Sequence, residues 1–282
     1  MIPQSVDYKR ASSVKDAIAI LGANPDAKIL SGGHSLIPAL KLRLSNPSLL
    51  IDINKISELR YIKDRGNYIA IGANSTHKDI ISNADVARQT AMVEAGEMIG
   101  DVQIRNVGTI GGSIAHADPS ADWPAVLMAL GTTIKTEGPD GERETPAADF
   151  FTGFFSTALE EGEIVTEVKL PEPKAGQKSS YQKFMQPASR FAIVGCAASV
   201  VTSGGIVTEA TVAFTGVSLD GAFIDDAIGA ALVGKAPTTE NIEAAANAAA
   251  ENCEMNEDNF ASAPYRKQMA KVFAKRALMA SV

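Results

Sequence analysis

The sequence has few residues that could form disulfides or bind metals. It contains two cysteines, Cys196 and Cys253, and neither has a second cysteine or a histidine at ligand spacing. A zinc site or an iron–sulphur cluster built by this chain alone is therefore not expected. Cys196 lies in an apolar run, where a buried thiol is the better interpretation, and Cys253 is interpreted as structural or incidental.

Long apolar runs and basic runs are also missing. No apolar segment among the 282 residues approaches the length of a membrane span, and the segment 1–10 lacks the apolar centre of a secretory signal. The formal net charge is −7, and an acidic chain without a basic run is a poor partner for nucleic acid. We expect a cytoplasmic protein with no membrane span and no nucleic-acid partner.

What the sequence has instead is glycine in pairs. The first pair lies in 28–35, where a short apolar strand is predicted to enter a tight turn before a helix that begins near Leu36. Adjacent glycines let a backbone approach a ligand closely, Ser35 is a predicted helix cap, and amides at a helix start attract phosphate. A plain strand-to-helix turn is the alternative. The residues of this first turn are Lys28, Ile29, Leu30, Ser31, Gly32, Gly33, His34 and Ser35.

A second glycine pair, in 109–113, favours the functional interpretation. Two such turns predict two backbone clamps on one diphosphate, assisted by hydroxyl or imidazole hydrogen bonds. The first turn lacks the third glycine of the dinucleotide-binding Rossmann fingerprint, and the Gly-Lys-Ser/Thr ending of a P-loop is absent. The residues of the second turn are Thr109, Ile110, Gly111, Gly112 and Ser113.

Periodicity divides the chain into parts. Strand, helix and strand within 27–53 predict a parallel pair with a right-handed crossover. A hairpin signal at 64–67 marks a second unit, in which 101–122 has little regular periodicity and is expected to be a long functional segment. A linker is predicted at 171–176. Antiparallel strands are predicted at 181–185, 192–201 and 207–217, and helices at 86–99, 225–233, 239–253 and 262–278, besides one that Ser13 caps.

Several single residues allow more than one interpretation. Asp122 is interpreted as a cap of the helix at Trp123 that also touches a ligand, and a catalytic carboxylate pair with Asp118 is the alternative. His34 and His116 are better interpreted as hydrogen-bond donors than as metal ligands, because nothing at helical spacing supports a metal site.

Other candidates have ordinary structural interpretations. His77 is expected at the surface, and a lone strand lysine such as Lys183 is usually solvent-facing. The aromatic cluster 150–155 is expected in the core, with a contact surface as the alternative. No Ser/His/Asp or Cys/His arrangement supports nucleophilic catalysis, and we expect neither a catalytic side chain nor a metal on this chain.

The two glycine turns together carry a family resemblance. The segment 31–38 resembles the first flavin loop of the medium, FAD-binding subunit of molybdenum hydroxylases, and 103–113 resembles the second. This family includes the medium subunit of aerobic carbon monoxide dehydrogenase and the FAD subunits of bacterial xanthine dehydrogenases. The resemblance extends over essentially the whole chain. Ser31 stands where alanine is common, and Ser113 where asparagine is common.

The resemblance implies an α+β architecture with FAD as the cofactor. It implies a p-cresol methylhydroxylase-type FAD-binding fold in two α/β subdomains, at 1–56 and 57–171, followed by an antiparallel sheet with a helical bundle at 177–282. The two turns would hold the phosphates of FAD, largely through backbone amides.

The resemblance also implies roles for residues nearer the flavin ring. Asp122 would lie on the flavin side of the second turn, and the backbone of Ile164 would meet the ring system. Lys183 matches a family lysine near the flavin, where a cation would stabilise the reduced anionic form. Phe191 occupies a region where some members carry a tyrosine, so the aromatic cover of the ring is left open.

The implied function is electron transfer within a complex. Substrate would be oxidised at a molybdopterin centre in a large subunit, electrons would cross 2Fe-2S clusters in a small subunit to the FAD of this chain, and the assembly would be a dimer of heterotrimers. Two alternatives are a stand-alone flavin reductase of the UDP-N-acetylenolpyruvylglucosamine reductase class and a binding or assembly protein without cofactor. The substrate and the electron acceptor are not revealed by the sequence.

Overall fold

The computed structural model describes residues 2–282, and its amino-terminal part is a small parallel sheet. The strands β1 (Asp7–Arg10), β2 (Lys28–Leu30) and β3 (Leu49–Asp52) lie in the order β1-β3-β2, and both pairings are parallel. The predicted parallel pair of β2 and β3 is confirmed, whereas β1 was not predicted. Two helices, α1 (Val14–Ala23) and α2 (Leu36–Leu42), connect these strands.

The starts of these two helices differ from each other. Ser13 caps α1 as predicted, because its side chain accepts a hydrogen bond from the backbone N–H of Asp16. Ser35 stands directly before α2, but its side chain makes no capping hydrogen bond, so this part of the prediction is wrong. The αR conformation of Ser35 explains the difference, since a capping residue normally has an extended backbone.

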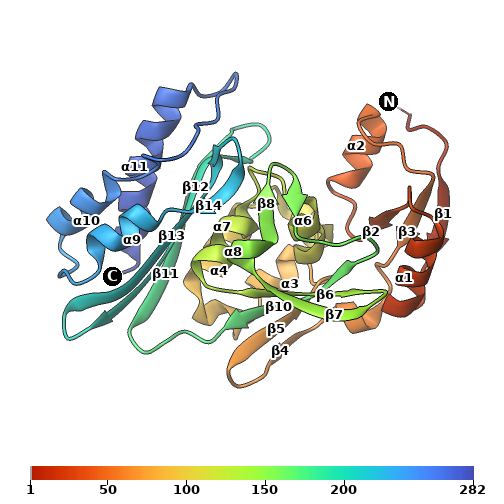
Figure 1. The fold of residues 1–282 in the computed structure, drawn as a ribbon, viewed down its shortest axis with the longest axis horizontal. Coiled ribbons are helices and arrows are strands. Elements are labelled where there is room, and N and C mark those ends of the chain that lie inside the picture. Colours follow the sequence, from red (N-terminus) through yellow and green to blue (C-terminus); the bar gives the residue numbers. More distant parts are fainter. Residues whose placement is uncertain (1) are drawn as a thin grey trace.

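A five-stranded sheet forms the middle of the molecule (Figure 1). Its order is β4-β5-β10-β6-β7, and every pairing is antiparallel. The hairpin predicted at 64–67 connects β4 to β5. The strand bounds are β4 (Ile62–Asp64), β5 (Tyr68–Gly72), β6 (Thr133–Gly138), β7 (Gly141–Pro146) and β10 (Ile164–Pro171), and β8 (Phe151–Gly153) pairs separately with β9 (Ser156–Thr157).

The helices of this middle part are mostly short. Their bounds are α3 (His77–Ile81), α4 (Thr90–Met98), α5 (Val102–Val107), α6 (Ile110–His116), α7 (Asp122–Ala129) and α8 (Ala147–Phe150), with 3-10 turns η1 (Ser57–Leu59) and η2 (Val86–Arg88). The single helix predicted at 86–99 is thus two pieces. Gln89 separates them because its backbone is extended and its buried side chain donates to the carbonyl oxygen of Pro171.

The expectation for 101–122 is corrected in the same way. This segment contains α5 and α6 rather than an irregular stretch. Asp101 accepts a hydrogen bond from the N–H of Ile104, and Thr109 accepts one from Gly112, so each helix has its own cap. Helices of one or two turns are too short to show a helical period in the sequence.

The carboxy-terminal part is a four-stranded antiparallel sheet with its own helices on one face (Figure 1). The helices α9, α10 and α11 cover the face that points away from the middle of the molecule, and α4 and α7 pack on the other face. The strands are β11 (Gln177–Met185), β12 (Ala192–Ser203), β13 (Ile206–Ser218) and β14 (Gly221–Ile224), and the helices are α9 (Asp226–Leu232), α10 (Thr239–Ala246) and α11 (Ala263–Ala280).

These bounds correct one helix of the prediction. The helix predicted at 239–253 ends at Ala246. Asp225 accepts a hydrogen bond from the N–H of Ala250, which has the left-handed backbone conformation with φ of 55°. This arrangement interrupts the alanine-rich run before Cys253.

Core and surface features qualify other expectations. The cluster 150–155 is divided, since Phe150 is buried while Phe154 and Phe155 are exposed. Cys196 is buried, as predicted.

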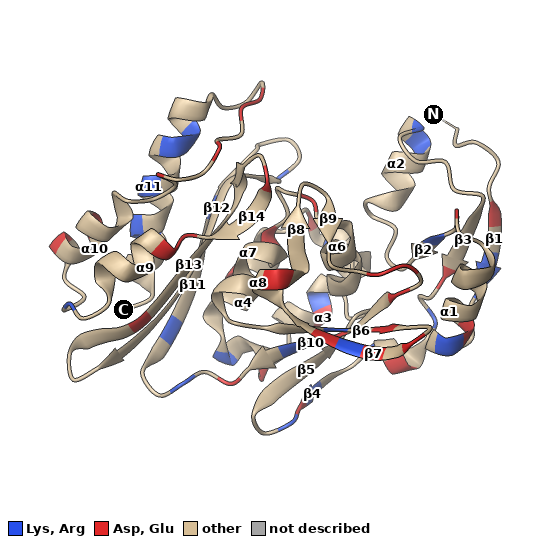
Figure 2. Cartoon of the chain, viewed as in Figure 1, with Lys and Arg blue, Asp and Glu red and all other residues tan. Residues whose placement is uncertain are grey.

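Figure 2 shows acidic and basic residues interspersed along the chain, with several basic residues on α11. Among residues 2–282, every helix is too short or too polar to cross a membrane.

The three larger sheets lie within 7–52, 62–171 and 177–224. We propose that they are the centres of the units expected at 1–56, 57–171 and 177–282.

A buried arginine joins the last helix to the carboxy-terminal sheet. Arg266 of α11 is 1% exposed, and its guanidinium donates to the carbonyl oxygens of Ile193 and Gly216, the latter at 2.7 Å. Its Nη2 also lies 2.8 Å from the carboxylate of Asp258. Removal of this side chain would leave buried acceptors without a donor.

We therefore expect Arg266→Leu to lower the free energy of unfolding by roughly 3 kcal/mol. Denaturant unfolding followed by circular dichroism would measure the change. Arg276→Leu on the exposed face of the same helix is the matched control, and its expected cost is below about 1 kcal/mol. Equal losses in the two variants would contradict the assigned role of Arg266.

Candidate cofactor site

The two glycine turns lie on one cavity of about 600 Å³. Every residue predicted for the site lines this cavity except Ile110 and Lys183. Ile110 is fully buried in the core, and its N–H donates to the carbonyl oxygen of Ser75. Lys183 lies behind a residue that does line the cavity.

The first turn lies directly against the segment before the second. A Cβ atom on Gly32 would lie 2.3 Å from the carbonyl oxygen of Val107 and 2.9 Å from the Cα of Gly108. Gly33 has φ of 69°, a conformation that favours glycine. The turn therefore needs glycine at 32 for close approach and at 33 for its backbone conformation.

Side-chain hydrogen bonds join the two turns. The hydroxyl of Ser31 donates to the side-chain oxygen of Asn74 at 2.6 Å, and it lies 2.9 Å from the hydroxyl of Thr109. Asn74 also donates to the carbonyl oxygen of Ile53 at 2.7 Å. A serine at position 31 thus links the first sheet to the second turn.

The second turn differs from its prediction in its local structure. Gly111 and Gly112 lie in the first turn of α6, whereas the sequence predicted a glycine turn within a long segment of little periodicity. A Cβ atom on Gly111 would lie 2.5 Å from the Cβ of Ala73, and one on Gly112 would lie 2.9 Å from the hydroxyl oxygen of Thr109. Close packing against Ala73, the residue after β5, and against the Thr109 cap therefore requires the glycine pair.

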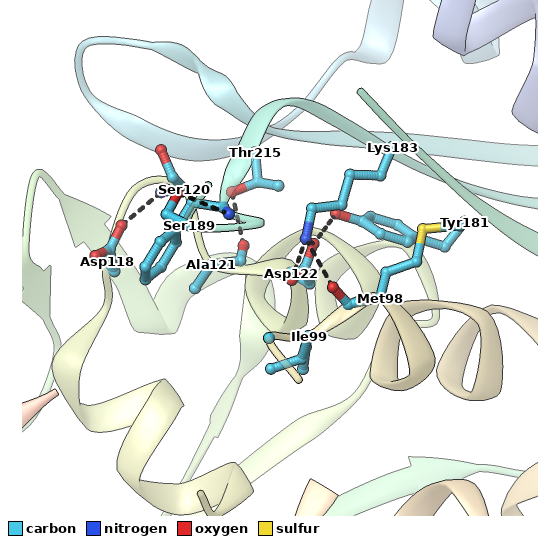
Figure 3. Close-up of polar contacts among 12 residues, drawn as sticks. Met98, Ile99, Asp118, Ser120, Ala121, Asp122, Tyr181, Lys183, Ser189 and Thr215 are labelled. Carbon is cyan, nitrogen blue, oxygen red and sulfur yellow. Dashed lines mark hydrogen bonds and ion pairs between the residues drawn. The ribbon is translucent and has the colours of Figure 1, made fainter. Parts of the chain in front are cut away.

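Asp122 and Lys183 form a buried ion pair beside the cavity. Figure 3 shows Lys183 and Tyr181 converging on Asp122. The ammonium nitrogen of Lys183 lies 2.9 Å from the carboxylate and donates to the carbonyl oxygen of Met98 at 3.2 Å. The side chain of Lys183 is completely buried, in contrast to the usual position of a strand lysine.

The role of Asp122 as a helix cap is wrong. Asp122 is the first residue of α7, its side chain is 5% exposed, and the capping position is taken by Ala121. The carboxylate instead accepts hydrogen bonds from Lys183 and from the hydroxyl of Tyr181. Burial raises the pKa of Asp122, and the attraction of Lys183 and the Tyr181 hydrogen bond oppose that rise.

The carboxy-terminal sheet fixes the loop that precedes Asp122. The hydroxyl of Thr215 lies 2.9 Å from the carbonyl oxygen of Pro119 and 2.7 Å from that of Ala121. The N–H of Gly216 donates to Pro119 at 2.7 Å, and that of Ala192 donates to Ser120 at 3.2 Å. This loop also carries Asp118, whose pKa is raised by burial.

The histidines occupy three different environments. The Nδ1 of His34 lies 2.7 Å from the carbonyl oxygen of Gly32, and the His116 ring packs edge-on against Phe155. Both line the cavity and are exposed. Within residues 2–282, no group of three or more His, Cys, Asp or Glu side chains is arranged to hold a metal ion.

His77 corrects the expectation of a surface residue. It is 5% exposed and lines the cavity. The Thr76–Asp79 capping pattern in the sequence indicates where α3 begins. It does not indicate that His77, the first residue of this helix, contacts Trp123, which follows 46 positions later. Asn74 was also missed, because an isolated asparagine has no sequence signal for its role.

The residues of the cavity fit a flavin dinucleotide. At the close contacts of the two turns, glycine leaves the backbone uncovered by side chains. The hydroxyls of Ser31 and Thr109 lie between the turns. The remainder of the cavity lining is largely apolar. A volume of about 600 Å³ is ample for much of such a ligand. Phe191, 44% exposed, lines the same cavity and is available to cover an aromatic ring.

Two family models match the chain. Residues 4–173 match the FAD binding domain in molybdopterin dehydrogenase, and residues 179–281 match the CO dehydrogenase flavoprotein C-terminal domain. The chain belongs to the FAD-binding medium subunits of molybdenum hydroxylases. FAD is therefore the cofactor of this chain, and the α+β fold implied by the sequence resemblance is confirmed.

Relatives match over almost their whole length. The carbon monoxide dehydrogenase medium chain of Hydrogenophaga pseudoflava is 42% identical, with 100% of this chain and 98% of the relative covered. The glyceraldehyde dehydrogenase medium chain of Sulfolobus acidocaldarius is 35% identical, with 98% of each covered.

Solved structures agree with these matches. A chain of carbon monoxide dehydrogenase from Hydrogenophaga pseudoflava has a TM-score of 0.96 at 43% identity, with 100% of this chain and 98% of that chain covered. A chain of quinoline 2-oxidoreductase from Pseudomonas putida 86 has a TM-score of 0.93 at 31% identity, with 99% and 97% covered.

We expect Gly32→Val to weaken FAD binding by roughly tenfold or more, because its Cβ would collide with Val107 and separate the turns. FAD retained after gel filtration would measure the loss. Gly22→Val is the matched control, since a Cβ there meets nothing within 4 Å. Full retention of FAD by Gly32→Val would exclude the first turn from the binding site.

Proposed function

We propose that this chain is the electron-transfer subunit of its complex. It would take electrons from iron–sulphur clusters of a small partner subunit and pass them to an external acceptor, while a large molybdopterin-binding subunit oxidises the substrate. Relatives with almost complete coverage are named medium chains, which supports large and small partners. We also propose a dimer of heterotrimers as the assembly.

The observation that carries this proposal is the meeting of both glycine turns on one cavity in a chain with two cysteines. Cys196 lies in β12 and Cys253 follows α10, and within residues 2–282 neither belongs to a group of three or more side chains arranged to hold a metal ion. Such a chain offers a flavin site and an inadequate ligand set for a cluster. In the proposed function, the flavin therefore receives its electrons from clusters on another chain.

We propose that the predicted residues act together to bind and tune FAD. Bound FAD supplies the capacity to accept and release one or two electrons. Lys28–Ser35 and Thr109–Ser113 would hold the phosphates through backbone amides and hydroxyls. Ile164 would lie against the ring system, and Asp122 with Lys183 would set the charge beside it.

Isolation of the chain from its native source would test the function. We expect a yellow complex in which one larger and one smaller polypeptide accompany this chain, and in which metal analysis finds molybdenum and iron. A chain isolated alone as an active flavoprotein would favour the stand-alone reductase. A chain that takes up no FAD, alone or with its partners, would favour a binding or assembly protein.

The buried ion pair predicts that loss of each partner changes the FAD reduction potential in opposite directions. Reduced flavin carries added negative charge, so Lys183→Met should lower the FAD reduction potential by roughly 30–60 mV, equivalent to ten- to a hundredfold for a two-electron couple. Asp122→Asn should raise the potential, because Lys183 is then uncompensated. Redox titration of the FAD-loaded complex would measure both.

Lys178→Met is the matched control for this pair of variants. Lys178 belongs to the same strand but is exposed, and its ammonium group donates to the carbonyl oxygen of Val282. Its loss should leave the potential unchanged. Shifts of the same sign in Lys183→Met and Asp122→Asn would contradict an electrostatic role.

A further inference from the structure

His77 has a fixed backbone position beside the second turn. Thr76 and Asp79 form a capping box, in which the Thr76 side chain accepts from the N–H of Asp79 and the Asp79 carboxylate accepts from that of Thr76. The N–H of His77 then donates to the carbonyl oxygen of Gly108 at 3.0 Å. The backbone that carries the His77 ring is therefore fixed by hydrogen bonds.

A tryptophan fixes the tautomer of the His77 ring. The indole N–H of Trp123 lies 3.0 Å from Nδ1 of His77, and Trp123 is completely buried. Since an indole nitrogen only donates, Nδ1 must be the acceptor. A neutral ring with an accepting Nδ1 carries its proton on Nε2.

The ring is neutral in the ordinary working range of pH. Burial, with smaller contributions from the charges of His34 and Arg105, lowers the pKa of His77 to about 4. Protonation would also require Nδ1 to stop accepting the hydrogen bond from Trp123. His77 is thus a neutral donor whose N–H is on a known atom.

That donor has no acceptor within the protein. Nε2 of His77 makes no hydrogen bond to any of residues 2–282, although the side chain is buried. The ring lines the cavity, and a Cβ on Gly108 would lie 2.8 Å from Nε2. The free N–H therefore lies where the backbone of Gly32 approaches Gly108. Because His77 lines the cavity, this N–H is free to donate to a ligand oxygen there.

We propose that Nε2–H of His77 donates a hydrogen bond to an oxygen of the FAD diphosphate where the two glycine turns meet. This inference rests on the proposed location of FAD in this cavity. It adds a residue outside both turns to the binding site. The Trp123 hydrogen bond makes His77 a donor before the cofactor arrives, so no proton has to be taken up on binding.

Nitrogen NMR of the full chain labelled in histidine would test the tautomer directly. The chain contains three histidines, so few signals need assignment. We expect one ring with an unprotonated Nδ1 and a protonated Nε2 that stays unchanged between about pH 8 and pH 5. A proton on Nδ1, or titration of this ring near its ordinary pKa, would overturn the proposal.

Substitutions would test the hydrogen bond to FAD. His77→Leu should raise the Kd for FAD roughly ten- to a hundredfold, since a donor to a charged oxygen is lost. His77→Gln should recover most of the affinity, because its amide N–H reaches about as far as Nε2. Fluorescence quenching of FAD would give Kd for the chain alone, or for its complex where binding requires assembly.

Trp123→Phe is the matched control for packing. It removes the hydrogen bond to Nδ1 and alters the same buried packing, but the neutral His77 ring stays in place and can still carry its proton on Nε2, so the effect on Kd should be much smaller than that of His77→Leu. Equal losses in these two variants, or no recovery in His77→Gln, would reduce His77 to a packing role and overturn the proposal. A wild-type chain that binds no FAD, alone or in its complex, would instead refute the proposed site.

Discussion

Gly32 lies so close to the carbonyl group of Val107 that a Cβ atom on it would be 2.3 Å from the oxygen, and the arrangement of the site depends on this approach. No side chain larger than hydrogen fits between them. The first sheet is small and parallel. The contact between Gly32 and Val107 places the glycine turn of this sheet against the middle part of the molecule. Ser31 adds hydrogen-bonding contacts to Asn74 and Thr109 across the same junction. A single cavity therefore exists because two segments far apart in sequence touch through their backbones.

The carboxy-terminal sheet contributes to the site without supplying a turn. Thr215 and Gly216 fix the loop at 119–121, and Lys183 of β11 pairs with the carboxylate that follows this loop. A buried ion pair is a poor source of stability, because desolvation of both charges offsets their attraction. Its position beside the cavity is better explained by control of local charge. Arg266 of α11 donates to the carbonyl oxygen of Gly216, and the N–H of Gly216 donates to Pro119 in the loop, so hydrogen bonds at one residue connect α11 to the loop.

Local sequence signals predicted those features that depend on neighbouring residues. The Ser13 cap, the hairpin at 64–67 and the apolar strands all follow from residues within one element. The glycine pairs could also be identified from the sequence, because adjacent glycines allow backbone conformations and close approaches that other residues do not. The caps at Asp101 and Thr109 were overlooked because each begins a helix too short to repeat a pattern.

Features that depend on tertiary contacts could not be found in this way. The separation between His77 and Trp123 is 46 residues, and that between Asp122 and Lys183 is 61. No periodicity within one element relates such residues, and a histidine near a helix start or a lysine on a strand is ordinarily exposed. The family resemblance supplied a role for Lys183 but not its partner, which the geometry identifies as Asp122.

The lining suggests a division between holding the cofactor and tuning it. Within 31–35 and 109–113 the proposed phosphate contacts come from amides and hydroxyls, and the neutral ring of His77 adds a further donor, whereas Lys28 is the one ammonium group of the first turn. Neutral donors bind an anion without adding a charge that changes between pH 5 and 8. The formal charges of Asp122 and Lys183 lie together beside the cavity, with Asp122 on its wall and Lys183 behind Asp122. Substitutions in the turns should then affect retention of FAD, whereas substitutions in the ion pair should affect its potential.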